Sequence, residues 1–114
     1  MHELSMMSSI VAQVEELAVK EKFEHVYEIK LTIGAMSGID PSCLEFCFEE
    51  ATSSSILKGA KLSIHGVEVE LCCQVCRQLS SPKNFAELVC SECQSNNVSI
   101  THGREFNIKE IEVD

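Results

Sequence analysis

Cys73-Gln-Val-Cys76 and Cys90-Ser-Glu-Cys93 are the two stretches that decide the fold of this 114-residue chain. Each stretch is a Cys-x2-Cys knuckle, and thirteen residues separate the two. Two such knuckles can close four thiolates around one tetrahedral ion, the usual arrangement of structural zinc, and they leave no open coordination position. The spacing therefore predicts a zinc site that holds a small module together and activates no water.

Two disulfides are the main alternative for these cysteines. Disulfides persist in oxidising compartments, but the chain opens Met-His-Glu-Leu-Ser, without the basic start and apolar run of a signal peptide. Seven cysteines is also an odd number. We therefore expect reduced thiols and a cytoplasmic location. Cys72 adds an ambiguity, because it lies beside Cys73; the repeated x2 spacing favours Cys73 as the ligand and leaves Cys72 a spare thiol.

The charge balance argues against one common role of zinc modules. The chain has 9 Lys and Arg against 18 Asp and Glu, a formal net charge of −9. Nucleic-acid-binding proteins usually carry a basic patch that neutralises phosphates, and between Cys73 and Cys93 the only basic residues are Arg77 and Lys83. The apolar stretches are also shorter than the ~20 residues of a membrane span. We expect neither a nucleic-acid nor a membrane partner.

The periodicity of the apolar residues predicts two helices and a sheet. Residues 4 to about 20 repeat apolar positions at helical spacing, and residues 27–33 alternate as a half-buried strand does. Asp40-Pro41 is typical of a helix start, with Asp as N-cap and Pro at the first helical position. Two later β segments are expected at 62–71 and 98–113. The first changes phase at His65-Gly66, which indicates a bulge or bend, while the second is interrupted near its start by Gly103 and changes phase between Ile108 and Ile111.

The order of these elements predicts an α+β fold with an insertion. Residues 1–70 and 99–114 would form a discontinuous domain of two helices on a three-stranded sheet. Residues 71–98 would form a zinc-ribbon module inserted between two of its strands.

His2 is the strongest functional candidate after the cysteines. A histidine in second position can bind a metal through its imidazole Nδ1, its own amide nitrogen and the α-amine of Met1, while the amide of Glu3 takes the fourth corner. This nitrogen-rich, square-planar set suits Ni2+ and Cu2+. The amides bind only after losing their protons, so the affinity should rise with pH. A histidine near the start by chance is the alternative, since Met-His-Glu alone is a weak signal.

The remaining metal-ligand types have simpler interpretations. Cys43 and Cys47 lie four residues apart on the expected second helix and could share a face as a second metal site, but buried free cysteines are common. His25, His65 and His102 are expected to be surface residues. The sequence shows no Ser-His-Asp series and no phosphate-binding glycine loop, and the expected zinc site is closed. We therefore do not expect an enzyme.

Several motifs together carry a resemblance that spans the whole chain. They are Met1-His2-Glu3-Leu4-Ser5, Gly34-Ala-Met-Ser-Gly38, Leu44-Glu-Phe-Cys-Phe-Glu49, the two knuckles and Ile108-Lys-Glu-Ile-Glu-Val113. In combination they resemble the hydrogenase nickel-incorporation protein HypA family. Cys43 and Cys72 are not part of that family's metal pattern.

The resemblance implies a nickel metallochaperone for the maturation of [NiFe]-hydrogenase. It implies that Met1, His2 and Glu3 hold Ni2+ through the amine, the backbone amides and the His2 imidazole. Structural Zn2+ would be held by Cys73, Cys76, Cys90 and Cys93. The implied partners are the GTPase HypB and the hydrogenase large-subunit precursor, and some members of the family also serve urease. The competing interpretation is a zinc-ribbon protein–protein interaction module without a metal-transfer role, in which His2 is incidental.

Overall fold

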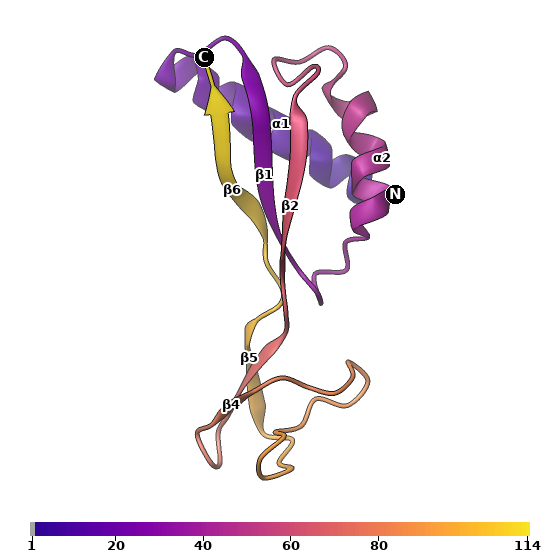
Figure 1. Cartoon of the computed structure of the whole chain (residues 1–114), viewed down its shortest axis with the longest axis vertical. Helices are drawn as coiled ribbons and strands as arrows, with labels where there is room; N and C mark the ends of the chain where they lie inside the picture. Colours follow the sequence, from indigo (N-terminus) through magenta and orange to yellow (C-terminus); the bar gives the residue numbers. More distant parts are fainter. Residues whose placement is uncertain (1) are drawn as a thin grey trace. The chain divides into compact units, whose positions relative to one another are not determined.

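The computed structural model describes residues 2–114, and for His2 only the backbone. The chain folds as two compact units (Figure 1). The first unit comprises the residues up to Thr32, Ile39–His65 and Asn107–Asp114, and the second comprises Ile33–Gly38 and Gly66–Phe106. The division predicted from the sequence, a discontinuous domain of 1–70 plus 99–114 with a zinc-binding module at 71–98, stays a prediction.

The first unit contains both helices, α1 (His2–Glu21) and α2 (Pro41–Thr52), which pack against each other. Asp40 caps α2 as predicted, because its side-chain oxygen accepts hydrogen bonds from the N–H groups of Ser42 and Cys43. Pro41 occupies the first helical position, where its missing N–H costs nothing. Helix α1 crosses behind the strands of a sheet in Figure 1.

That sheet has three strands in the order β2 (Lys61–Val67), β1 (Val26–Gly34) and β6 (Phe106–Val113). The central strand supplies buried apolar side chains on one face, while the intervening Glu28, Lys30 and Thr32 remain partly exposed. The core of this unit combines residues from the helices, from β1 and from the segment after α2: Met7, Ile10, Val14, Ile29, Leu31, Leu44 and Leu57. The alternation predicts Tyr27 on the buried face, but it is 51% exposed and its ring lies edge-on to His25.

The second unit contains a smaller antiparallel sheet in the order β4 (Leu79–Ser80), β3 (Glu70–Cys73) and β5 (Val98–His102). The sequence did not predict β4, which is only two residues long. The phase change at His65-Gly66 and the interruption at Gly103 lie near the places where the chain leaves one sheet and enters the other. The phase change between Ile108 and Ile111 lies inside β6. At the second break Gly103 has φ +120°, a backbone conformation that favours glycine.

The predicted fold is confirmed: two helices, a three-stranded sheet and a cysteine-bearing module inserted before the last strand. Neither helix is both long and apolar enough to cross a membrane.

Candidate metal centres

Four thiols of the second unit converge on one point. The Sγ atoms of Cys73, Cys76, Cys90 and Cys93, the four-cysteine group, all lie within 4.8 Å of one another. The closest pairs are Cys73 with Cys93, at 3.5 Å, and Cys76 with Cys90, at 3.6 Å. Four sulfurs bound to one ion at about 2.3 Å form a tetrahedron with edges of about 3.8 Å. All seven cysteines are free thiols, so the four-cysteine group has the dimensions of a metal site without disulfides.

The two knuckles hold their sulfurs by the same local geometry. In the first, the N–H groups of Val75 and Cys76 donate to the Cys73 sulfur at 3.3 and 3.4 Å. In the second, the N–H groups of Glu92 and Cys93 donate to the Cys90 sulfur at 3.4 and 3.5 Å. Donors of this kind stabilise a thiolate over a thiol.

The turns that follow are also equivalent. Arg77 donates its N–H to the Cys73 carbonyl and has φ 66°, while Gln94 donates to the Cys90 carbonyl and has φ 67°. Each knuckle closes with a bond from the first cysteine's N–H to the carbonyl five residues on, at Gln78 or Ser95. The two knuckles therefore have the same backbone geometry, and each presents two sulfur atoms.

The thiols perturb one another's ionisation. Backbone donors, led by the N–H of Cys76, lower the pKa of Cys73 to about 6. At Cys90, the N–H of Cys93 is the main cause that lowers the pKa. At Cys76 the N–H of Gln78 acts to lower the pKa, but burial and the neighbouring thiols outweigh it and raise the pKa to about 12. A bound dication would remove this conflict by letting all four sulfurs ionise together. The donor set thus fits zinc.

Cys72 lies outside the four-cysteine group. It is the third residue of β3, half-buried, and its Sγ lies 3.9 Å from the Cys73 carbonyl oxygen. Because successive strand residues point to opposite faces, Cys73 and Cys72 cannot both face the other knuckle. Of the two neighbouring cysteines, the structure brings Cys73 to the other thiols.

The N-terminal candidates lie in the first unit. Met1 is outside the described residues, and His2 is the first residue of α1. Glu3, next in the helix, is 8% exposed, and its Oε2 accepts a hydrogen bond from the Asp40 N–H at 3.3 Å. The first turn of α1 is thereby tied to the start of α2. The Glu3 carboxylate is directed to α2, and the predicted chelate would use the Glu3 backbone amide instead of this carboxylate.

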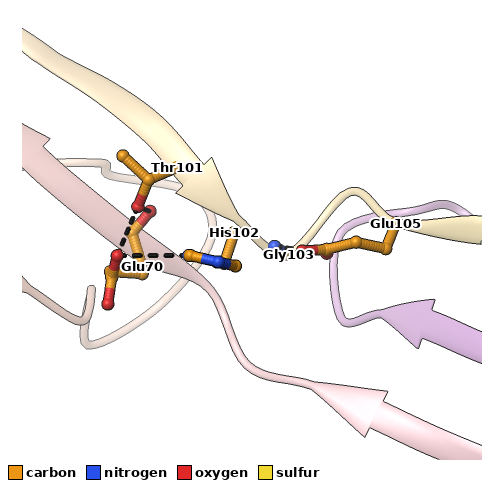
Figure 2. Close-up of polar contacts among 5 residues, drawn as sticks. All are labelled: Glu70, Thr101, His102, Gly103 and Glu105. Carbon is orange, nitrogen blue, oxygen red and sulfur yellow. Dashed lines mark hydrogen bonds and ion pairs between the residues drawn. The ribbon is translucent and has the colours of Figure 1, made fainter.

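Of the three histidines outside the N-terminus, His102 takes part in a polar network that the sequence did not predict. His65 and His102 are exposed and His25 is half-buried. In the second unit, Glu70 Oε1 accepts a hydrogen bond from the Thr101 hydroxyl at 2.6 Å and lies 3.2 Å from His102 Nδ1 (Figure 2). Those bonds, Thr101 first, lower the pKa of Glu70. Glu70 and His102 are opposite one another in the β3–β5 ladder, a pairing that no sequence motif indicates.

Comparisons with known proteins agree with this architecture. The family model described as "Hydrogenase/urease nickel incorporation, metallochaperone, hypA" matches residues 1–113. The hydrogenase maturation factor HypA of Psychromonas ingrahamii is 39% identical over 100% of this chain and 99% of that protein. The corresponding factor of Syntrophus aciditrophicus is 35% identical, and the alignment covers both chains completely.

Two solved structures share the fold. A solution structure of a HypA protein gives a TM-score of 0.76 at 35% identity and covers 99% of this chain and 96% of that one. The solution structure of the Ni metallochaperone HypA from Helicobacter pylori gives a TM-score of 0.72 at 34% identity, with coverage of 97% and 96%.

Proposed function

Because the chain belongs to the HypA family of hydrogenase/urease nickel-incorporation metallochaperones, we propose that it binds Ni2+ at its N-terminus and delivers the ion for maturation of [NiFe]-hydrogenase. The cargo ligands would be the Met1 amine, the amides of His2 and Glu3, and the His2 imidazole. Zn2+ on Cys73, Cys76, Cys90 and Cys93 would be the resident, structural metal. The thiols of that site must stay reduced, which suits a carrier working in the cytoplasm.

The start of α1 at His2 is the observation that supports this assignment most directly. The N–H groups of a helix's first turn take no part in its i→i−4 hydrogen bonds. A metal can therefore replace the amide protons of His2 and Glu3 without breaking a bond of the helix ladder. The two amidates formed are anions at the positive end of the helix dipole, which stabilises them.

The charge of the complex also fits this position. Two amidates, a neutral amine and a neutral imidazole balance the two charges of Ni2+, so no net charge is added beside the helix terminus. Four nitrogen donors in one plane are a geometry that Ni2+ favours. Release would need only protons or competing ligands, because amine and imidazole nitrogens take up protons readily.

The family assignment supports a proposal about two protein partners. We propose that the GTPase HypB and the hydrogenase large-subunit precursor exchange nickel with this chain. A net charge of −9 suits a carrier of cations and does not suit a nucleic-acid-binding protein.

Titration of Ni2+ into zinc-loaded protein with a native N-terminus tests the assignment. His2→Ala removes the only side-chain donor of the chelate, so we expect it to weaken Ni2+ binding by more than about 100-fold, beyond what loss of a supporting residue causes. Adding one residue before Met1 converts the amine to an amide and should have the same effect. Affinity should fall on mild acidification, as amine and imidazole take up protons.

Glu3→Gln is the matched control, because it preserves the backbone amide. It should weaken Ni2+ binding much less than His2→Ala. Calorimetry and zinc content would be measured for all four proteins. Equal Ni2+ affinity in each would refute the N-terminal site and favour the competing function, a zinc-ribbon interaction module without metal transfer.

A further inference from the structure

The outward side of helix α2 carries an aromatic side chain that the fold does not cover. Leu44, Phe48 and Thr52 are buried, whereas Phe46 on the same helix is 85% exposed. Among the described residues, no other large apolar side chain is as exposed. Aromatic side chains are enriched where two proteins meet, because they supply large contact area at a low cost in conformational entropy. Phe46 therefore has the character of an anchor for a protein partner.

Three exposed carboxylates accompany this ring on α2. Glu49 and Glu50 follow Phe46 by three and four positions, and Glu45 precedes Glu49 by four, so helical spacing makes them neighbours. Like charges at this spacing destabilise a helix, and carboxylates near its C-terminal end oppose the helix dipole. None of the three pairs with a Lys or Arg side chain in the part of the chain that the structure describes. These four residues, the α2 outer face, thus carry a negative charge that a cationic partner would offset.

A groove lies beside two of these carboxylates. Glu45 and Glu49 line a cavity of about 500 Å3, whose lining also includes the apolar Phe48 and Ala60 and the cation of Lys58. Arg and Lys side chains have an aliphatic stem and a cationic head, so the stem can lie on apolar surface while the head pairs with carboxylates. The groove therefore suits a basic side chain of a partner.

We propose that the α2 outer face docks a protein partner that offers an apolar pocket for Phe46 and Lys or Arg side chains around that pocket. One of these basic side chains enters the groove and pairs with Glu45 and Glu49. An apolar centre with a polar rim is the usual anatomy of an interface. A second copy of this chain does not fit, because its net charge is −9 and pairing the same face of two copies places carboxylates opposite carboxylates.

The α2 outer face lies in the same unit as the start of α1. Glu3 Oε2 accepts the Asp40 N–H at 3.3 Å, and the start of α1 lies beside α2 in Figure 1. Phe46 is six residues beyond Asp40, about 9 Å along a helix that rises about 1.5 Å per residue. A partner held at Phe46 is thus close to the start of α1. The docking surface stands on α2 alone, whereas its use in nickel transfer rests on the proposed function.

Binding of the two proposed partners to the full, zinc-loaded chain tests the surface. The GTPase HypB and the hydrogenase large-subunit precursor are immobilised in turn, and interferometry without Ni2+ measures association and dissociation. We expect at least one of them to bind, and Phe46→Ala to weaken that binding by at least about 10-fold, mainly through faster dissociation. Glu45→Gln/Glu49→Gln should slow association and flatten its salt dependence, because charge steers the encounter.

Two matched variants on α1 serve as controls. Val19→Ala shortens an apolar side chain that is 82% exposed, and Glu15→Gln/Glu16→Gln changes the net charge as much as the α2 double variant does. Both should bind the partner as the wild type does. Because Phe46 is exposed and Ala favours helices, Phe46→Ala should keep the fold, which circular dichroism and zinc content check.

Three results would overturn the docking surface: no binding of either partner, equal affinity of Phe46→Ala and Val19→Ala, or a salt dependence that Glu45→Gln/Glu49→Gln leaves unchanged. Failure of the nickel proposal gives a different pattern. Phe46→Ala should bind Ni2+ as the wild type does, whereas His2→Ala should lose Ni2+ binding and still bind the partner with wild-type affinity.

Discussion

Gly34, the last residue of β1, lies where the neighbouring backbone leaves no room for a side chain. Its N–H donates to the Glu105 carbonyl at 2.7 Å. A Cβ atom at this position would overlap the Gly103 carbonyl group and lie 2.6 Å from the Arg104 nitrogen. All of these are backbone atoms, which cannot move aside as a flexible side chain would.

Gly34→Ala should therefore destabilise the protein by about 1–3 kcal/mol or more, the cost of overpacking a filled site. Gly66→Ala is the matched control, because nothing lies within 4 Å of its Cβ position and its φ is not positive. Urea unfolding of the zinc-loaded proteins measures both changes. Similar unfolding midpoints for the two variants would contradict the close approach.

Residue-scale prediction from sequence succeeded where chemistry is local. The Asp40 cap depends on residues two and three positions along the chain. The Cys-x2-Cys spacing favours Cys73 over Cys72 as the zinc ligand, and Cys73 is the thiol that lies with the other three. Prediction from sequence could not find the close approach at Gly34 or the network of Glu70 with Thr101 and His102. Those contacts join residues about 30 or more positions apart, and only the fold brings them together.

At the scale of elements, the strand pattern is informative but incomplete. From sequence alone, the phase change at His65-Gly66 indicates a bulge or bend, and Gly103 indicates an interruption of the last β segment. The chain instead runs from β2 into β3 and from β5 into β6, and each time it changes sheets. A phase change reports that the buried face has switched, but it does not say whether a bulge or a second sheet causes the switch.

The ion pair between β1 and β6 gives a pH-dependent test of the first sheet. Lys30 Nζ lies 2.9 Å from Glu110 Oε1, and their hydrogen bond is the main cause that lowers the pKa of Glu110 and raises the pKa of Lys30. The Glu110 contribution to stability should be present above its unfolded pKa and lost as pH falls through the lowered folded value. The Lys30 contribution should be lost as pH rises through its raised value.

NMR titration of the Glu110 carboxyl carbon should therefore give a midpoint below 4.5, the ordinary value. Lys30→Met should move that midpoint back upward, since the donor is removed. Lys109→Met, a neighbour on β6 whose charge has a smaller influence through space, should move it less. If Lys30→Met left the titration midpoint of Glu110 unchanged, the ion pair would not persist in solution.

At the scale of the whole molecule, the two units depend on different sources of stability. The first buries apolar side chains from two helices and a sheet. Among the described residues, the buried apolar set of the second is much smaller: Ile33, Val69, Leu71, Cys73 and Cys90. Two of these five are thiols of the four-cysteine group, so a metal bound there would add stability where a core is lacking. The spacing of the cysteines predicts a metal-stabilised module, whereas the borders of the two units could be found only from the contacts of the folded chain.

Removing zinc should therefore unfold the second unit selectively. Metal binding contributes about 10–16 kcal/mol in small zinc domains, far more than the few buried side chains of this unit can replace. Hydrogen exchange gives a residue-level measurement. In zinc-free protein, the amides of Cys73 and Cys90, which close the two knuckles, should lose protection. The Val26 amide, bonded to the Ile56 carbonyl in the first unit, should keep most of its protection.

Cys76→Ser should reproduce the zinc-free exchange pattern, because three thiolates leave the tetrahedron open. Cys72→Ser should match the wild type in both zinc content and exchange. If Val26 and Cys73 lost protection together and to the same extent, the two units would unfold as one cooperative body. In that case the zinc would stabilise the whole chain, including the helix start that is proposed to carry nickel, and loss of zinc would also abolish Ni2+ binding. Selective loss at Cys73 and Cys90 instead predicts that zinc-free protein still binds Ni2+ at its N-terminus.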